Sequence, residues 1–406
     1  MRVFRVSHSF VAASTRRHAW RKPRRVRVSA AMDPNPNTNT RVGFRRDEMW
    51  SESLVGTVKQ HDTHAFLVHG DALTWPGKEF ESAADKSSDS VVSPAIVMHE
   101  ALLQASGTYK GGIHKFEKGA SAAGNVKLNL AEMPGSQGGV ASDQPGDILL
   151  FPQMQRHRLG DEAVKDPTEV KKFVKSVVVD GDANEKNKSD ISGKAHIFVC
   201  THGKRDARCG VCGPTLVEAF RDAVARDEHL KNKVEVRGCS HVGGHAYAGN
   251  VLVFAPGNGV MSDASKILKN TSDVQGTWYG YVTPGEIGEV LQRTVLTGEV
   301  VPRLWRGSMG MDPLEHESAA KEAAEKAGEP WPPAKTPCDV CAETDGLADI
   351  EDVAGVPSSS VKKHNTAAGV NNVSSKSSGL ERTFMATAAI GAVGLVASVV
   401  WSFLED

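Results

Sequence analysis

The segment from Cys200 to Gly249 constrains the fold of this chain more than any other part of it. It reads CTHGKRDARCGVCG, then a run with apolar residues at helical spacing, then VRGCSHVGGHAYAG. Four of the six cysteines lie in this segment, and five of the fifteen histidines lie in it or at its edge. Thiolate and imidazole are the side chains that bind soft and borderline metals. The segment therefore predicts a metal or thiol site that the remaining elements must position.

The length and charge of the chain set broad limits on its organisation. At 406 residues it is long enough for two ordinary domains with tails. A formal net charge of −1 gives no global attraction for nucleic acid, and we expect no nucleic-acid partner. No secretory leader is evident, so a disulfide framework is not the first interpretation of the cysteines.

The N-terminal residues carry a strong local charge. Residues 1–31 contain nine Arg or Lys and no acidic residue, with Ser and Ala among them. That composition is typical of a transit peptide, with a basic nucleic-acid-binding arm as the alternative. We expect this peptide to target the protein to the chloroplast, with the mitochondrion as the second choice. A polar linker at 32–49 is expected to follow it.

The C-terminal residues predict a membrane anchor. Residues 383–404 are 22 residues without a charge, which is about 33 Å of helix and enough for a hydrocarbon core of about 30 Å. By the positive-inside tendency the folded domains lie on the side of Arg382, so we expect a chloroplast membrane or, alternatively, a mitochondrial membrane. Residues 313–382 are expected to form a helix and a flexible spacer that carries Cys338 and Cys341, and both termini of the chain are expected to be disordered.

A first domain is predicted at 50–178. Strand-like runs at 64–70 and 146–152 flank a helix at 93–106, and the Gly-rich stretch 107–125 is expected to be a loop. A charged linker at 179–190 follows, after a short helix at 167–178.

The second domain, at 191–312, has a recognisable order of elements. A strand that ends on Cys200 precedes a helix at 213–227, and Thr283 with Pro284 begins a later helix. Three more strands are predicted between these helices, at 233–239, 250–257 and 277–282. The order β-α-β-β-α is that of a thioredoxin-like fold, so the chain is predicted to be α/β.

Three sites can be built from the cysteines and histidines. Cys209 and Cys212 before a helix could be a thiol-disulfide oxidoreductase pair, because a helix N-terminus lowers the pKa of a thiol. The same pair with His241 and His245 could be a structural zinc site that makes the domain a binding module. Cys200 and Cys209 with the two histidines could instead hold a two-iron two-sulfur cluster, with two Cys on one iron and two His on the other.

Local geometry favours the cluster. Cys200 ends a strand and Cys209 follows an eight-residue loop, so both can face the rim of the sheet. Gly243 and Gly244 within HVGGH predict a close turn, which can bring His241 and His245 to one metal ion.

Several motifs of this chain resemble one known family. CTHGKRDARCGVCGP, HVGGHAYAGNV, TWYGYVTPGE and LWRGSMGM look like the sucrase/ferredoxin-like family, which includes the fungal actin-patch-distal proteins. The resemblance covers roughly residues 50–312. It implies two tandem thioredoxin-like domains, the N-terminal one degenerate and without a metal site. It also implies a ferredoxin-type second domain whose cluster is held by the ligands Cys200, Cys209, His241 and His245.

These inferences predict a membrane-anchored electron-transfer protein with a two-iron two-sulfur cluster, and a carrier more than an enzyme with its own substrate. Supporting positions are Cys212, Gly243, Gly244, Tyr247 and Asn250, and residues 305–307 are expected to pack nearby. A basic loop is expected to dock a redox partner protein of unknown identity through Lys204, Arg205 and Arg208.

Overall fold

The computed structural model describes residues 53–81, 93–182, 187–257, 274–312 and 314–332, with a few single positions outside these ranges. The predicted transit peptide (1–31), most of the linker at 32–49 and the predicted anchor (383–404) lie outside the described residues, as do Cys338 and Cys341. Within the described part of the chain, no helix is long and apolar enough to cross a membrane.

The C-terminal half has the predicted order β-α-β-β-α. Strand β8 runs parallel to β9 and antiparallel to β10, and β10 pairs with β11, so the strands lie in the order β11-β10-β8-β9. The bounds of these elements are β8 Ala195–Cys200, α4 Ala207–Arg226, β9 Val234–Cys239, β10 Val251–Pro256, β11 Val274–Tyr279, α5 Ile287–Val290 and η7 Leu291–Thr297.

The N-terminal half repeats this arrangement. Strand β1 runs parallel to β4 and antiparallel to β5, and β5 pairs with β6, which gives the order β6-β5-β1-β4. The bounds are β1 Thr63–Val68, α2 Pro94–Ser106, β4 Val126–Ala131, β5 Asp147–Phe151, β6 Gln155–Arg158, α3 Pro167–Phe173 and η2 Val174–Val179. The two halves therefore have the same topology.

The halves are joined at one edge and packed face to face. Ala131 of β4 pairs antiparallel with Cys239 of β9, which makes the strands one continuous sheet. The sheet folds over, because Phe66 of β1 stacks on Phe198 of β8 with ring centroids 3.8 Å apart. These rings belong to one buried cluster with strand residues of both halves.

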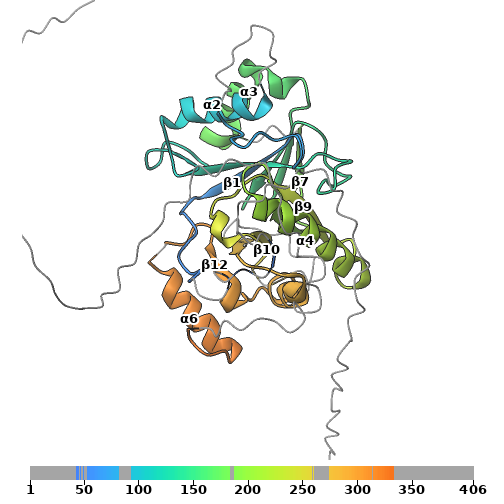
Figure 1. The fold of residues 1–406 in the computed structure, drawn as a ribbon. Helices are drawn as coiled ribbons and strands as arrows, with labels where there is room; N and C mark the ends of the chain where they lie inside the picture. Colours follow the sequence, from blue (N-terminus) through green and yellow to red (C-terminus); the bar gives the residue numbers. More distant parts are fainter. Residues whose placement is uncertain are drawn as a thin grey trace, which may run out of the picture. The chain divides into compact units, whose positions relative to one another are not determined.

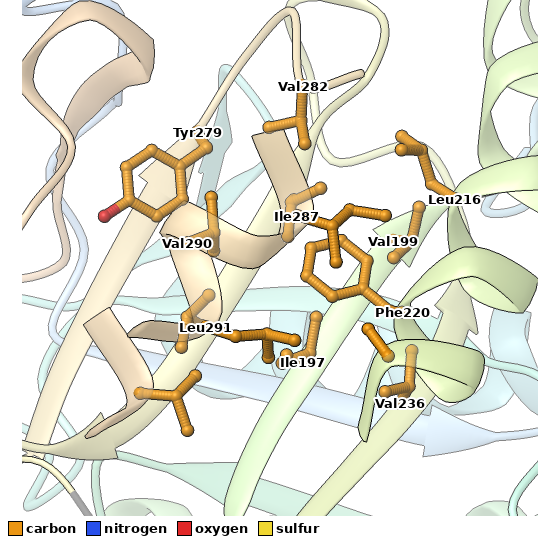
Figure 2. Close-up of a cluster of buried hydrophobic side chains, with 14 of the residues drawn as sticks. Ile197, Val199, Leu216, Phe220, Val236, Tyr279, Val282, Ile287, Val290 and Leu291 are labelled. Carbon is orange, nitrogen blue, oxygen red and sulfur yellow. The ribbon is translucent and has the colours of Figure 1, made fainter. Parts of the chain in front are cut away.

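Helices cover the outer face of each half. In the C-terminal half, α4 and α5 close a buried cluster in which Leu216 and Phe220 lie beside Val199 and Ile287 (Figure 2). In the N-terminal half, α2 and α3 lie side by side over β1 and β5 (Figure 1). Because each strand is covered on both faces, β1, β4, β5 and β8 are buried along their whole length.

Several elements differ from the sequence expectations. The Gly-rich stretch expected to be a loop contains a hairpin of β2 (Thr108–Lys110) and β3 (Ile113–Lys115) that pairs with β4. Helix α4 begins at Ala207 rather than 213, because Asp206 caps it by accepting a hydrogen bond from the backbone N–H of Arg208.

Two edge strands were not indicated by the sequence, whereas two features near the C-terminal end of the described chain were. Strand β7 (Lys188–Asp190) lies inside the predicted linker and pairs with β6. Strand β12 (Trp305–Ser308) pairs with β11, and α6 (His316–Ala327) forms the helix expected after residue 313. Thr283 begins the helix at 284–297 as its N-cap, as expected, and the structure adds a capping box with Glu286 that was not predicted.

Candidate metal centre

Two thiols and one imidazole meet where β8, α4 and β9 come together. The ligand atoms of Cys200, Cys209 and His241 all lie within 4.8 Å of one another. Cys200 Sγ is 4.0 Å from His241 Nδ1. Cys200 is the last residue of β8, Cys209 lies in the first turn of α4, and His241 follows β9 by two residues. The parallel pairing of β8 with β9 places the ends of both strands at one rim.

The two cysteines of this group differ in the pKa of their thiols. A hydrogen bond from the Cys209 thiol lowers the pKa of Cys200 well below its ordinary value, and the His241 ring lowers it further. The same hydrogen bond raises the pKa of Cys209. The site therefore stabilises a thiolate at Cys200, which is the protonation state that a metal ion requires of its ligand.

Cys212 faces away from this group. It packs in the outer core of the C-terminal half with Leu216 and Val217, whereas Cys200 and Cys209 pack in the core between the sheets. Burial raises the pKa of Cys212 to about 11. Cys239 pairs in register with Cys200, and burial raises the pKa of this thiol as well.

The two glycines after His241 form the expected turn. Gly243 has φ 95° and Gly244 has φ 73°, both in the region that favours glycine. A Cβ at Gly244 would lie 2.5 Å from Arg306 Nη2, so this position also needs a residue without a side chain. His245 begins the 3₁₀ turn η4 (His245–Tyr247), and the structure describes its backbone but not its side chain.

Arg306 holds this turn in place. It lies on β12 within the segment expected near the site, and its guanidinium donates hydrogen bonds to Gly243 O at 3.2 Å and Asn250 Oδ1 at 2.6 Å. It also donates to Thr57 Oγ1 at 3.0 Å, from the N-terminal half. The Arg306 carbon Cζ lies 4.8 Å from the centre of the Tyr247 ring. Asn250 and Tyr247 therefore support the turn through this arginine.

The N-terminal half supplies further contacts that sequence reasoning missed. Asn129 of β4 donates to His241 O at 3.0 Å, and its Oδ1 lies 2.9 Å from His64 Nε2. The His241 backbone N–H donates to His202 Nδ1 at 3.4 Å. The signal that could have revealed β4 is the alternation of polar Lys127 and Asn129 with apolar residues in VKLNLA, which is typical of a strand with one polar face.

The basic loop of 203–208 lies beside the centre. Lys204 and Arg205 are exposed, and Arg205 Nη1 donates to Gly77 O at 3.2 Å. Arg208 is half-buried and forms an ion pair with Asp206 at 2.9 Å. The first two side chains are open to a partner, and the third is held against the helix cap.

The donor set fits a soft or borderline metal centre. Thiolate and imidazole ligands, held by three elements and screened from water on the cysteine side, match the chemistry of an iron–sulfur or zinc site. Carboxylate is absent from the group of three, so among the described residues this group does not favour a hard cation.

Comparison with known proteins identifies relatives of part of the chain. "Altered inheritance of mitochondria protein 32" from Debaryomyces hansenii is 38% identical over 129 residues, which are 31% of this chain and 41% of that protein. The protein of the same name from Meyerozyma guilliermondii is 36% identical over 111 residues, 27% of this chain and 33% of that protein. The alignments thus span about two-fifths or less of these relatives.

A solved structure and a family profile complete the comparison. The thioredoxin-like [2Fe-2S] ferredoxin from Aquifex aeolicus aligns with 20% identity and a TM-score of 0.23, over 30% of this chain and 96% of that one. A TM-score this low does not establish a common fold. Residues 54–307 match the profile of the sucrase/ferredoxin-like family. Because that match covers more than half of the 406 residues, the chain belongs to the sucrase/ferredoxin-like family.

Proposed function

We propose that this protein is an electron-transfer protein whose metal centre is a two-iron two-sulfur cluster held by Cys200, Cys209, His241 and His245. The observation that carries the proposal is the meeting of the first three ligand atoms within 4.8 Å, while Cys212 packs in a different core. His245 enters as the fourth ligand on its position in the HVGGH turn. We also propose that both halves are thioredoxin-like domains and that the N-terminal one carries no metal.

Such a cluster supplies one-electron oxidation and reduction. The residues of the chain determine where electrons enter and how charge is balanced. Cys200 and Cys209 are buried, whereas His241 is partly exposed and lines a cavity, so the histidine side is the side open to a redox partner. The buried guanidinium of Arg306 lies in the electrostatic field of Cys200 and Cys209, and a cation there stabilises added negative charge.

The dithiol alternative is disfavoured by Cys212. An attacking cysteine must be an accessible thiolate, but Cys209 and Cys212 are both fully buried. The pKa of Cys209 is raised by its hydrogen bond to Cys200, and burial raises the pKa of Cys212 to about 11. The zinc alternative that used Cys209 with Cys212 meets the same difficulty, because Cys212 points into the outer core.

The test is the metal content of three variants of the full chain, purified without oxygen. Cys200→Ser and Cys209→Ser should lose iron, acid-labile sulfide and visible absorption. Cys212→Ser should keep all three, and it is the matched control because it removes a buried thiol from the same helix. Retention of the chromophore in Cys200→Ser, or its loss only in Cys212→Ser, would contradict the proposal.

The partner-docking surface, the membrane anchor and the organelle are proposed from the sequence. We propose that Lys204, Arg205 and Arg208 dock an acidic redox partner. We also propose that residues 383–404 anchor the protein in a membrane, with its domains on the side of Arg382. Of the two predicted organelles, the name shared by the curated relatives supports the mitochondrion. The organelle that imports a fusion of residues 1–31 to a fluorescent protein tests this localisation.

A further inference from the structure

A cavity of about 710 Å³ opens beside His241, between the two halves. Its volume lies within the range of about 300–1,000 Å³ that is usual for small-molecule sites. One wall comes from the glycine turn at 243–244 with Tyr247 and Arg306, and the opposite wall comes from the N-terminal half. Cys200 and Cys209 do not line it, whereas His241 does, so the cavity adjoins the metal centre on its histidine side.

The charges that line this cavity are unbalanced. Its walls hold five cationic side chains and only two carboxylates, which gives a formal charge of +3. Glu81 forms an ion pair with Lys78 at 2.8 Å. Glu79 is therefore the one carboxylate left to face the other four cations of the lining, which are Lys59, Lys127, Arg205 and Arg306.

Two of these cations are buried without a carboxylate partner. Lys127 is 8% exposed, and within the described residues its ammonium group forms no ion pair or hydrogen bond. Arg306 is 2% exposed and donates only to neutral oxygen atoms, on Thr57, Gly243 and Asn250. A buried charge is costly unless an opposite charge or a dense set of hydrogen bonds compensates it, and of these two cations only Arg306 has such a set.

Other groups of the lining also lack a partner. The buried indole N–H of Trp278 has no acceptor among the described residues. Lys127 Nζ lies over the face of the Trp278 ring, 5.8 Å from its centre, so the contact that the structure gives it is with an aromatic face and not with an anion. Burial, with the charge of Lys59 added, lowers the pKa of Lys127 to about 8, and the field of Glu79 only partly offsets this.

We infer that this cavity is a binding site for a small organic oxyanion, a phosphate ester or a carboxylate, which is held by Lys127 with Lys59, Arg205 and Arg306 around it. The anion would neutralise the ammonium group of Lys127 and accept hydrogen bonds from it. Aromatic walls at Tyr247 and Trp278 suit the organic part of such a molecule. Because the ligand would lie against His241, it would occupy the partly exposed side of the metal centre.

Calorimetric titration of the full chain tests this inference, with inorganic phosphate and citrate as two separate probes at constant ionic strength in chloride. Lys127→Met removes the buried charge and keeps the length of the side chain. Lys171→Met on α3 is the matched control, because it removes an exposed lysine remote from the lining. We expect at least one probe to bind, with affinity at least about tenfold weaker in Lys127→Met and changed less than about twofold in Lys171→Met.

Thermal unfolding separates a binding site from a merely structural cation. The wild-type protein should gain about 2–4 °C in Tm at saturating probe, while Lys127→Met should gain nothing and should start from a Tm no lower than that of the wild type. A response to phosphate alone would assign a phosphate ester, and a response to citrate alone would assign a carboxylate. Failure of both probes to bind, or equal weakening in the two lysine variants, would overturn the inference. Neither readout requires a cluster, so the result does not depend on the proposed function.

Discussion

Arg306 Nη1 donates a hydrogen bond to Asn250 Oδ1 at 2.6 Å, and Asn250 Nδ2 in turn donates to Gly244 O at 3.1 Å. This relay connects β12 to the turn that carries His241. The same guanidinium reaches Thr57 of the N-terminal half, 249 residues away in sequence. The position of the histidine turn therefore depends on both halves of the molecule.

Replacement of Arg306 by Lys keeps the positive charge but removes the planar guanidinium with its several N–H donors. We expect a loss of about 2 kcal/mol in the free energy of unfolding, because an ammonium group cannot reach Thr57, Gly243 and Asn250 together. Urea titration measures the loss. Arg226→Lys, at an exposed pair with Asp222, is the control and should change stability by less than about 0.5 kcal/mol. Equal effects of the two variants would refute the bracing role of Arg306.

The two glycines of the turn should differ in their tolerance of a side chain. Gly243→Ala meets no atom within 4 Å and should cost about 1 kcal/mol, from its positive φ alone. Gly244→Ala should cost at least about 2 kcal/mol, because its Cβ would also displace Arg306 from its partners. Denaturant unfolding of both variants checks the order, and the reverse order would show that Arg306 does not pack as described.

The shared aromatic core predicts that the two halves unfold together. Phe66 and Phe198 stack across the interface between the two halves of the folded sheet, and both are fully buried. Phe66→Ala should cost about 3–5 kcal/mol and should leave one cooperative transition by fluorescence and by circular dichroism. Leu73→Ala is the control, since Leu73 is 82% exposed. A separate transition for each half in the wild-type protein would be inconsistent with this core.

Acid should destabilise the fold through its buried histidines. Burial lowers the pKa of His157 to about 4, against about 6.5 in the unfolded chain. Between these values the unfolded chain binds a proton at this residue and the folded protein does not. The contribution of the neutral ring is therefore complete above pH 6.5 and is lost as the pH falls towards 4.

The pH dependence can be assigned to this residue by substitution. His157→Gln should flatten the slope of unfolding free energy against pH by up to about 1.4 kcal/mol per pH unit in that window. Urea titrations at pH 7, 6 and 5 give the slopes, and His229→Gln is the control because it removes an imidazole from the surface. An unchanged slope in His157→Gln would show that this ring is not held neutral by the fold.

The sequence predicted the strands and helices whose patterns are local. The helix start at Thr283 and Pro284 and the strand that ends on Cys200 are visible within a few residues, and the structure has both. The predicted start of α4 is six residues too late, because Gly210 and Gly213-Pro214 lower helix propensity and the Asp206 cap was not recognised.

Features that depend on distant contacts could not be predicted in this way. The pairing of Ala131 with Cys239 and the hydrogen bond from Asn129 to His241 join residues more than 100 positions apart. Strand β4 was missed because Lys127 and Asn129 face a cavity that only the second half of the chain completes. The HVGGH turn was predictable from its glycines, whereas its dependence on Arg306 was not.

The central claim is that the site holds a two-iron two-sulfur cluster, and the most direct test is the metal content of the full chain purified without oxygen. Iron, acid-labile sulfide and zinc are measured alongside the visible absorption spectrum before and after dithionite. We expect a red-brown protein with about two irons and two sulfides per chain, whose colour bleaches on reduction. A colourless protein that contains about one zinc per chain, or no metal and two titratable thiols, would contradict it.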